Sequence, residues 1–423
     1  MKVDLEKLTH FFSQKGTVLL LESQFGDHPA SRKSYLAALP KAEIKARDDE
    51  VFITENDSTQ KHKKNPWQAL QAFRKVHNEW LFGYLGYDLK NHTEKLTSQN
   101  PDQIRAPDLY FMVPQFLIEV DRETSEGKLL IGNFPPKKEL DSVETVSSFS
   151  FQNIRPQLVK SDYLARIREA QHRIREGTFY EINLSHQLKG KFNDPPLVLY
   201  KQMKEVAPVP FGAFFQNDDV AVCCQSPERF LRKEGDIIYS QPIKGTSPRG
   251  KDENEDFLLK EKLLSSEKEQ AENLMIVDLV RNDLSRIARP ASVKALKLFE
   301  IETFGTVHQM VSTVTAEADE EDPVAILKAC FPMGSMTGAP KISAMQAIEE
   351  LENYRRGIYS GALGYITPQG NFDFNVVIRT AIIKNDELFY SVGGAITADS
   401  DPECEWKETL IKARALTDAV SLP

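Results

Sequence analysis

The order of the apolar segments limits the fold of this chain more than any other feature. Short apolar runs that suit buried strands occur at residues 17–21, 109–112, 129–131, 179–184, 220–224 and 237–240. Longer segments with the helical spacing of apolar residues stand between them. The strands and helices do not alternate in the regular βαβ rhythm of a parallel sheet, so the pattern favours an α+β fold.

Local start signals place the longer helices. We expect helices to begin near Ser161, Ser266, Pro340 and Asp401, because these residue types cap a helix or occupy its first turn. The first of these helices should end at Gly177. The last helix should bury one face that consists of Trp406, Leu410, Ala413, Leu416 and Val420.

A polar stretch rich in Ser and Glu interrupts this pattern between residues 135 and 156. We therefore expect the chain to divide into an N-terminal region, residues 1–150, and a second region, residues 155–423. A chain of 423 residues is long enough for either one large core or two domains.

The charge balance excludes several classes of protein. Acidic side chains outnumber basic ones by 62 to 53, which gives a formal charge of −9. General nucleic-acid binders and membrane-surface binders favour basic surfaces instead. No run of about 18 apolar residues is present, and the first residues lack the apolar core of a signal peptide. We expect a cytoplasmic protein that binds neither nucleic acid nor membrane, and whose anionic ligands would need a locally positive pocket or a metal ion.

Two pairs of glutamates are spaced three residues apart on expected helices, Glu269 with Glu272 and Glu405 with Glu408. This spacing puts both members of a pair on one helix face. Carboxylates from two helices suit Mg²⁺, which takes one or two carboxylates and fills its other positions with water and substrate oxygens. The alternative is a solvated helix surface. For Glu269, a further alternative is a capping box with Ser266, in which its carboxylate bonds backbone amides.

The segment QPIKGTSPRG, residues 241–250, follows an expected strand and is rich in turn residues. Burial of Lys244 at this strand end would lower the pKa of its amine and make it a nucleophile. The alternative is a lysine in solvent. Glu228, at the end of the preceding strand, could act as a general acid or base beside Lys244. The alternative for Glu228 is an ordinary ion pair with Arg229 or Arg232.

A loop punctuated by glycines, MGSMTGAPK at residues 333–341, leads into an expected helix. Free amides at a helix N-terminus attract anions, so Thr337, Gly338 and Lys341 are candidates to hold a substrate carboxylate. Arg379 interrupts the apolar strand VVIRT and can clamp a carboxylate with two parallel hydrogen bonds. A purely structural loop and an ion pair between Arg379 and an acidic neighbour are the alternatives.

Seven ordered motifs in the second region resemble those of the chorismate-utilising enzymes. They are SPERF, PIKGTSPRG, AENLMIVDLVRNDL, GSMTGAPK, YSGALGY, FNVVIRTA and GGAITADSDPECEWKET, and the resemblance spans residues 155–420. A weaker resemblance covers the N-terminal region through LLES at 20–23 and GYLGYD at 83–88. The resemblance implies an α+β sandwich of antiparallel sheets surrounded by helices.

One position separates the branches of this family. At the third position of this motif, the anthranilate synthase pattern PIAGT has an alanine and the pattern PIKGT of the aminodeoxychorismate synthase branch has a lysine. This chain has Lys244 at that position and so resembles the second branch. The resemblance to that branch implies that Lys244 attacks C2 of chorismate while Glu228 protonates the departing C4 hydroxyl. Ammonia would then add at C4 and expel the lysine, giving 4-amino-4-deoxychorismate for the synthesis of 4-aminobenzoate and folate.

The resemblance also implies a set of site residues. Mg²⁺ would be held by Glu272 and Glu408, with Glu269 and Glu405 nearby or bound through water. The pocket for the substrate carboxylates would consist of Tyr359, Arg379, Gly393, Gly394 and the Thr337–Gly338 turn.

Two positions depart from the family pattern. This chain has Glu181 at a position that differs among the relatives it resembles. The pattern of the water-adding relatives has a lysine there, and the pattern of the ammonia-using relatives more often has a glutamine. The missing lysine disfavours a hydroxylating enzyme and leaves the role of Glu181 open. Many members have histidine where this chain has Gln309, with His308 one place earlier, so we assign His308 no catalytic role.

The source of ammonia is expected to be another protein. The sequence contains no Gly-x-Cys-x-Gly nucleophile elbow of a glutamine amidotransferase. We therefore expect ammonia from a separate glutaminase subunit or from solution.

Two other functions stay open. One is an anthranilate synthase component I, which aminates C2 and eliminates pyruvate, and the other is a non-catalytic homologue that only binds chorismate or docks a glutaminase.

Overall fold

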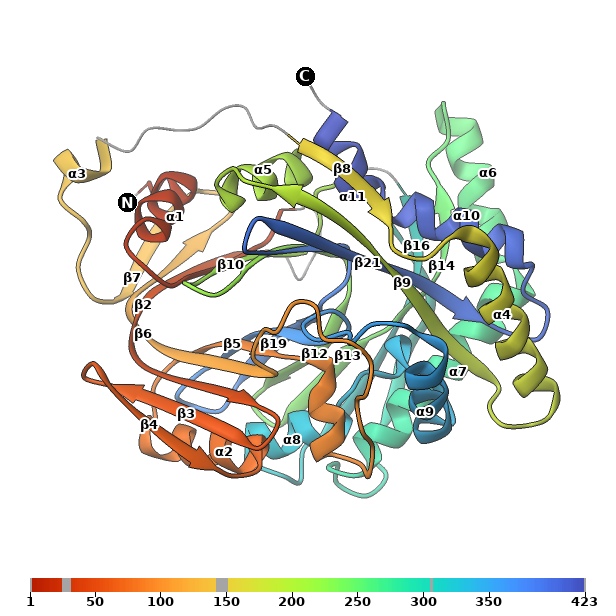
Figure 1. Ribbon diagram of the computed structural model, residues 1–423, viewed down its shortest axis with the longest axis horizontal. Helices are drawn as coiled ribbons and strands as arrows, with labels where there is room; N and C mark the ends of the chain where they lie inside the picture. The colour runs from red at the N-terminus through yellow and green to blue at the C-terminus, as the bar shows by residue number, and fades with distance from the viewer. Residues whose placement is uncertain (1, 25–31, 142–150, 305–306, 422–423) are drawn as a thin grey trace.

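The computed structural model describes residues 2–24, 32–141, 151–304 and 307–421. Over these ranges, 21 strands pair antiparallel in one hydrogen-bonded network. Figure 1 shows that the network folds into two facing layers with helices on both outer faces. The α+β sandwich of antiparallel sheets predicted from the sequence is confirmed.

The strands of the described ranges are β1 (Val18–Glu22), β2 (Lys33–Arg47), β3 (Glu50–Glu55), β4 (Ser58–Lys63), β5 (Leu81–Leu85), β6 (Leu109–Asp121), β7 (Gly127–Ile131), β8 (Phe151–Pro156), β9 (Glu181–Phe192), β10 (Phe211–Gln216), β11 (Ala221–Ser226), β12 (Arg229–Glu234), β13 (Ile237–Gln241), β14 (Ile243–Pro248), β15 (Lys294–Thr303), β16 (Val307–Glu317), β17 (Gly338–Ala339), β18 (Ala362–Ile366), β19 (Phe372–Val376), β20 (Thr380–Lys384) and β21 (Glu387–Ile396). Their α-helices are α1 (Leu5–Ser13), α2 (Pro66–Val76), α3 (Lys137–Asp141), α4 (Lys160–Arg175), α5 (Pro196–Val206), α6 (Glu253–Leu264), α7 (Glu267–Ser285), α8 (Pro323–Cys330), α9 (Lys341–Leu351), α10 (Pro402–Lys412) and α11 (Arg414–Thr417). Short 3-10 helices are η1 (Tyr87–His92), η2 (Gly334–Met336) and η3 (Ala419–Ser421).

Apolar cores lie between the two layers and on both outer faces. The middle core includes Tyr84, Tyr110, Phe215, Leu363 and Ile382. One outer core packs α1, α5 and α11 on the layer that contains β1, β9, β10 and β21. The other packs α2, α7 and α8 on the layer that contains β5, β12, β18 and β19 (Figure 1).

Two long strands, β2 and β6, run through both layers. In β2, Leu36 belongs to one outer core and Ile44 to the other. The pairing of β2 with β6 shifts register between Pro40 and Ala42. Such a shift turns alternating side chains to the opposite face, so one strand can serve both cores.

Strands from the two sequence regions pair with one another. β1 pairs with β10, and β5 pairs with β18, so both regions supply strands to the same layers. Residues 142–150 of the polar stretch lie outside the described residues. The division into residues 1–150 and 155–423 stays a prediction about sequence regions.

Several predicted helix ends are confirmed. Ser266 and Asp401 are the N-caps of α7 and α10, and Gly177 follows the end of α4 with a φ of +79°. The predicted apolar face of the last helix is wrong in part. Helix α10 ends at Lys412, before the shorter α11, and Leu410 is 41% exposed.

Two helix starts differ from the prediction by one or two residues. The N-cap of α4 is Val159 and not Ser161, whose hydroxyl lies 3.3 Å from the Asp162 carboxylate. Pro340 is the N-cap of α9 and not its first helical residue. Neither cap uses a side-chain oxygen, which is the signal that sequence reasoning relies on. Over the described ranges, no helix combines the length and apolar composition needed to cross a membrane.

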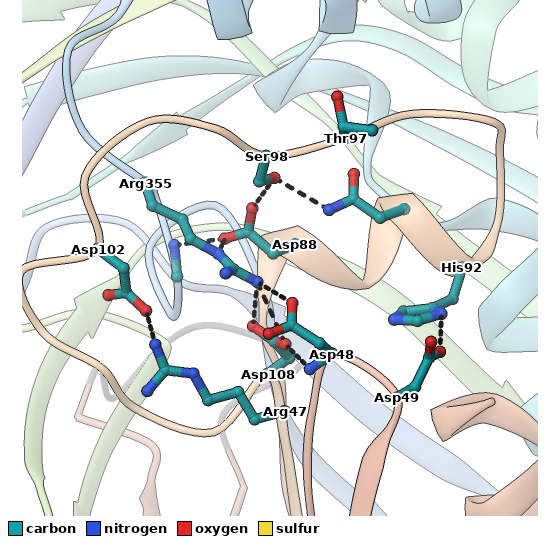
Figure 2. Close-up of polar contacts among 12 residues, drawn as sticks. Arg47, Asp48, Asp49, Asp88, His92, Thr97, Ser98, Asp102, Asp108 and Arg355 are labelled. Atoms are coloured by element: carbon teal, nitrogen blue, oxygen red, sulfur yellow. Dashed lines mark hydrogen bonds and ion pairs between the residues drawn. The ribbon is translucent and has the colours of Figure 1, made fainter. Parts of the chain in front are cut away.

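A buried ion-pair network ties the N-terminal region to the segment after α9 (Figure 2). The Arg355 guanidinium contacts Asp88, Asp108 and Asp48 at 3.2, 3.1 and 3.2 Å. Burial raises the pKa of Asp108 to about 7, against the opposing charge of Arg355.

Candidate active site

The candidate site lies where β9, β14, β21, α7 and α10 gather at one end of the molecule (Figure 1). Helix α7 packs on β14 and β16, and α10 packs on β21. Lys244 comes from β14, Glu228 from the link between β11 and β12, and Arg379 from the link between β19 and β20. The fold therefore brings together side chains that are far apart in the sequence.

Lys244 is buried and paired with Glu181 on β9. Its Nζ lies 2.5 Å from Glu181 Oε1, and the two side chains are 10% and 1% exposed. Burial alone would lower the pKa of Lys244, but the carboxylates of Glu181, Glu272 and Glu228 outweigh it and raise the pKa. The lowered pKa predicted from the sequence is wrong, because a partner 63 residues away holds the amine as an ammonium ion.

Glu228 is a buried carboxyl group that can be protonated near neutral pH. Its Oε1 accepts a hydrogen bond from Ser335 Oγ at 2.6 Å. Burial raises the pKa of Glu228 to about 7, although Ser335 and the charge of Lys244 lower it. The neighbouring Arg229 and Arg232 pair with other carboxylates, so the alternative of an ordinary ion pair to these arginines does not hold.

The two glutamate pairs approach one another from α7 and α10. Burial raises the pKa of Glu272 to about 7 and also raises the pKa values of Glu269 and Glu405. The charge of Glu408 on α10 adds to the rise at Glu269 on α7, so the pairs interact across the two helices. The pKa of Glu408 is lowered, because Lys412 Nζ lies 2.6 Å from its Oε1.

These carboxylates fit a hydrated Mg²⁺ by charge and by donor type. Within the described ranges, no three Asp, Glu, His or Cys side chains are placed to share one ion. Mg²⁺ commonly takes one or two carboxylates and keeps several waters, so the pair Glu272 and Glu408 stays a prediction. The capping-box alternative for Glu269 is half formed. The Ser266 hydroxyl accepts the Glu269 amide at 3.4 Å, but the Ser266 amide donates to Leu263 O.

Arg379 offers a guanidinium for an anion. No ion pair or hydrogen bond joins the guanidinium to any residue that the structure describes, and burial lowers the pKa of Arg379 against the charges of Tyr390 and Glu228. Its φ of +50° is unusual for a residue with a side chain, and costs roughly 1–2 kcal/mol. Such conformations cluster at binding and catalytic sites. The alternative of an ion pair between Arg379 and an acidic neighbour does not form within the described residues, and carboxylate binding by Arg379 stays a prediction.

The Thr337–Gly338 turn lies directly beside Glu181. A Cβ added to Gly338 would stand 2.1 Å from Glu181 O, and its φ is +147°, so only glycine fits. Thr337 is fully buried, with its hydroxyl 3.2 Å from Met333 O. The Thr337 amide donates to Gly334 O at 3.1 Å and its carbonyl accepts from Asn183 N at 2.8 Å, so the protein itself uses these groups. The predicted carboxylate binding by this turn therefore rests on Gly338 and stays a prediction.

The paired glycines of β21 lie against the acidic cluster. A Cβ on Gly394 would stand 3.3 Å from Glu405 Oε2 and 3.7 Å from Glu408 Oε1. Gly393 O accepts a hydrogen bond from Lys412 Nζ at 2.9 Å. A side chain at Gly394 would therefore crowd these two carboxylates.

Arg356 and Glu352 form a buried support that sequence reasoning missed. Arg356 Nη2 and Nε donate to the two Glu352 oxygens at 2.6 and 2.9 Å. The same guanidinium donates to Met336 O at 2.7 Å, just before the Thr337–Gly338 turn, and to Asn183 O at 2.8 Å on β9, which pairs with β17. It lies 5.8 Å from the ring of Tyr359, whose pKa burial raises to about 12. Tyr359 therefore keeps a proton that it can donate to a carboxylate. The i, i+4 spacing of Arg356 and Glu352 was the available signal.

Lys341 is occupied by contacts within the protein. Its ammonium group pairs with Asp283 and donates to Pro332 O at 2.8 Å. The side chains of Lys341 and Asp283 are 11% and 7% exposed. This placement argues against the predicted role of Lys341 in substrate binding and favours the structural alternative.

We expect Lys341→Ala to destabilise the protein without weakening the binding of its substrate. Removing one partner of a buried ion pair costs roughly 3–5 kcal/mol, because the other charge stays buried. The double variant Lys341→Met with Asp283→Leu should recover most of this loss. Urea unfolding measures the stability, and the KM for substrate measures binding. A large rise in KM with unchanged stability would instead support the predicted role of Lys341 in substrate binding.

His308 lies outside the candidate site. Its Nε2 is 3.0 Å from Asp256 Oδ1, its Nδ1 is 2.9 Å from Thr303 Oγ1, and its side chain is 1% exposed. These bonds give it a structural role. Gln309 pairs with Thr246 across β14 and β16, and its Oε1 is buried without a donor from the described residues.

The chain belongs to the chorismate binding enzyme family, whose family model matches residues 16–418. This family match and the sandwich fold thus define a chorismate-utilising enzyme.

Relatives of two kinds are similarly close. The chain is 34% identical to anthranilate synthase component 1 of Aquifex aeolicus (strain VF5), over 96% of this chain and 89% of that protein. It is also 34% identical to aminodeoxychorismate synthase component 1 of Escherichia coli (strain K12), over 94% and 92%. The crystal structure of anthranilate synthase component I from Streptococcus pneumoniae TIGR4 matches with a TM-score of 0.81 and 28% identity over 93% of each chain. Overall identity does not separate the two reactions.

Proposed function

We propose that this protein replaces the C4 hydroxyl of chorismate with an amino group, giving 4-amino-4-deoxychorismate and water. The observation that carries the proposal is Lys244, a buried amine that interacts with Glu228 and Glu272. A lysine at this position is also the pattern of the branch that aminates C4, whereas the anthranilate synthase pattern has an alanine there.

Lys244 is proposed to act as a nucleophile in the first step. Its Nζ bonds to C2, the two ring double bonds shift, and the bond from C4 to oxygen breaks. Glu228 donates a proton so that the oxygen leaves as water, and the proton that Lys244 loses restores Glu228. A covalent intermediate splits one difficult displacement into two easier steps.

The second step reverses the shift. Ammonia bonds to C4, the double bonds return, and the bond between C2 and Nζ breaks to release Lys244. Arg379, Tyr359 and the backbone of the Thr337–Gly338 turn would hold the substrate carboxylates during both steps. Mg²⁺ held by Glu272 and Glu408, with Glu269 and Glu405 nearby or through water, would supply positive charge for a ring carboxylate.

Ammonia is proposed to come from a separate glutaminase subunit or from solution. The name component 1 of the two curated relatives supports a second subunit. The chain itself has no Gly-x-Cys-x-Gly segment.

The product identifies the reaction. The protein is incubated with chorismate, Mg²⁺ and ammonium, with no lyase added, and the product is analysed by chromatography and mass spectrometry. We expect 4-amino-4-deoxychorismate. Direct appearance of anthranilate would show C2 amination, isochorismate would show hydroxylation, and unchanged chorismate would show a non-catalytic homologue. Each of these three results would overturn the proposal.

We expect Glu272→Ala to raise the Mg²⁺ concentration for half-maximal activity by at least about tenfold, because it removes a proposed ligand. A titration of activity with Mg²⁺ measures the change, and thermal unfolding checks the fold. Glu267→Ala is the matched control, since Glu267 lies exposed on the same helix. An unchanged titration for Glu272→Ala would remove that residue from the metal site.

A further inference from the structure

Glu181 has one carboxylate oxygen that the protein leaves unused. Its Oε1 accepts Lys244 Nζ at 2.5 Å, whereas Oε2 is buried and receives no hydrogen bond from any residue that the structure describes. The side chain is 1% exposed. A buried acceptor without a donor costs about 1–3 kcal/mol, so such an atom at an active site indicates a ligand.

A second unused acceptor lies on the same face of β9. Residues two apart on a strand point to the same side, so Asn183 follows Glu181 there. Its Nδ2 donates to Ser335 O at 3.2 Å, and its Oδ1 is buried without a donor from the described residues. The ligand beside β9 must therefore donate hydrogen bonds.

The charges around Glu181 favour a cation as that donor. The charged groups that face it are Lys244 on β14 and Glu272 on α7, and Glu228 in turn faces Lys244. Three carboxylates thus surround one ammonium group. The carboxylates of chorismate are acceptors only. Its C4 hydroxyl is a donor, but the proposed function places that hydroxyl at Glu228, so chorismate does not supply the missing donor.

We propose that Glu181 Oε2 binds the ammonium ion that serves as co-substrate, and that Glu181 carries the surplus proton of that ion to Lys244. The inference rests on the proposed amination of C4. C2 and C4 are separated by one ring carbon, so the incoming and departing nitrogens lie side by side. The two oxygens of one carboxylate can serve both.

The proton and bond balance of this step is complete. Ammonium gives one proton to Oε2, and the resulting ammonia bonds to C4 as the bond between C2 and Nζ breaks. The departing Lys244 amine takes the proton from Glu181. Lys244 returns to an ammonium ion paired with an ionised Glu181, and the product carries its new nitrogen as an ammonium group.

The test compares the protein with Glu181→Gln, which keeps the shape and removes the charge. The KM for total ammonium chloride is measured at several pH values below the pKa of ammonium in water. We expect the KM of the unmodified protein to stay within about twofold, because ammonium is then the dominant species. For Glu181→Gln we expect the KM to fall about tenfold per pH unit, in step with free ammonia. The matched control is Glu234→Gln, which makes the same change at an exposed glutamate.

Two further readouts separate the possible failures. The covalent adduct formed with chorismate and Mg²⁺, without ammonium, should appear in both proteins, since Lys244 and Glu228 are intact. If the unmodified protein forms no adduct, the proposed function fails. If both form it but their KM values share one pH dependence, only the role of Glu181 fails. A change in the Mg²⁺ titration of Glu181→Gln without a change in ammonium dependence would assign Oε2 to the metal and overturn the inference.

Discussion

Lys244→Ala is expected to lower the kcat for amination by about 10³-fold or more, because it removes the proposed nucleophile. The ring carboxylate site does not include Lys244, so the affinity for chorismate should change little. Stopped-time assays of 4-amino-4-deoxychorismate measure the rate, and calorimetric titration with chorismate measures the affinity. This combination of a lost rate and a kept affinity is characteristic of a residue that acts in the reaction itself.

The control for this variant is Lys251→Ala, which removes an exposed lysine from the segment that follows β14. It should retain full activity. The loss of the Lys244 charge also leaves Glu181 buried and unpaired, so the fold of Lys244→Ala must be checked by its thermal unfolding. Turnover within tenfold of the unmodified protein would remove the lysine from the mechanism, and direct attack of ammonia on C4 would replace it.

Glu228→Gln is expected to slow amination by about 10²–10⁴-fold, the usual contribution of a general acid. The pH dependence gives the sharper result. Burial raises the pKa of Glu228 to about 7, so the carboxyl group is protonated below that pH and ionised above it. For the unmodified protein, kcat/KM for chorismate should therefore fall as the pH rises through about 7. This decrease should be absent in Glu228→Gln.

Ser335→Ala provides a matched control for the assignment of that decrease. The Ser335 hydroxyl donates to Glu228 Oε1 and lowers the pKa of Glu228. Its removal should move the decrease to higher pH and leave the rate at low pH nearly unchanged. A decrease at the same pH in all three proteins would assign the titration to another group and would contradict the acid role of Glu228.

The sequence predicted correctly that each glutamate pair lies on one helix. The spacing of Glu269 and Glu272 on one helix, and of Glu405 and Glu408 on another, follows from helix geometry alone. That the two pairs interact depends on how α7 and α10 pack against β14 and β21. Such packing is a property of the whole sandwich, which the family resemblance predicted and single elements could not.

The protonation state of Lys244 could not be predicted from its own segment. Its neighbours in sequence are apolar or glycine, which indicated a lowered pKa. The raised pKa comes from Glu181, which stands 63 residues earlier and meets Lys244 only after β9 and β14 are brought together. For Lys341, the sequence showed a helix start that attracts anions. It did not show that Asp283 of α7 would pair with that ammonium group.

The support beneath the site was missed for a related reason. Arg356 and Glu352 lie in a segment with the turn residues Asn353 and Gly357, and their spacing alone is common on protein surfaces. Their importance comes from burial, since both side chains are 1% exposed and the guanidinium binds backbone carbonyls of two other segments. Burial of a charged pair is a tertiary property.

The most direct test of the central claim is intact-protein mass spectrometry after incubation with chorismate and Mg²⁺ in the absence of ammonium. The account predicts a protein adduct with the added mass of chorismate less one water, and peptide mapping should place it on Lys244. Addition of ammonium should discharge the adduct and release 4-amino-4-deoxychorismate. Amination at full rate with no adduct on Lys244 at any time would contradict the account.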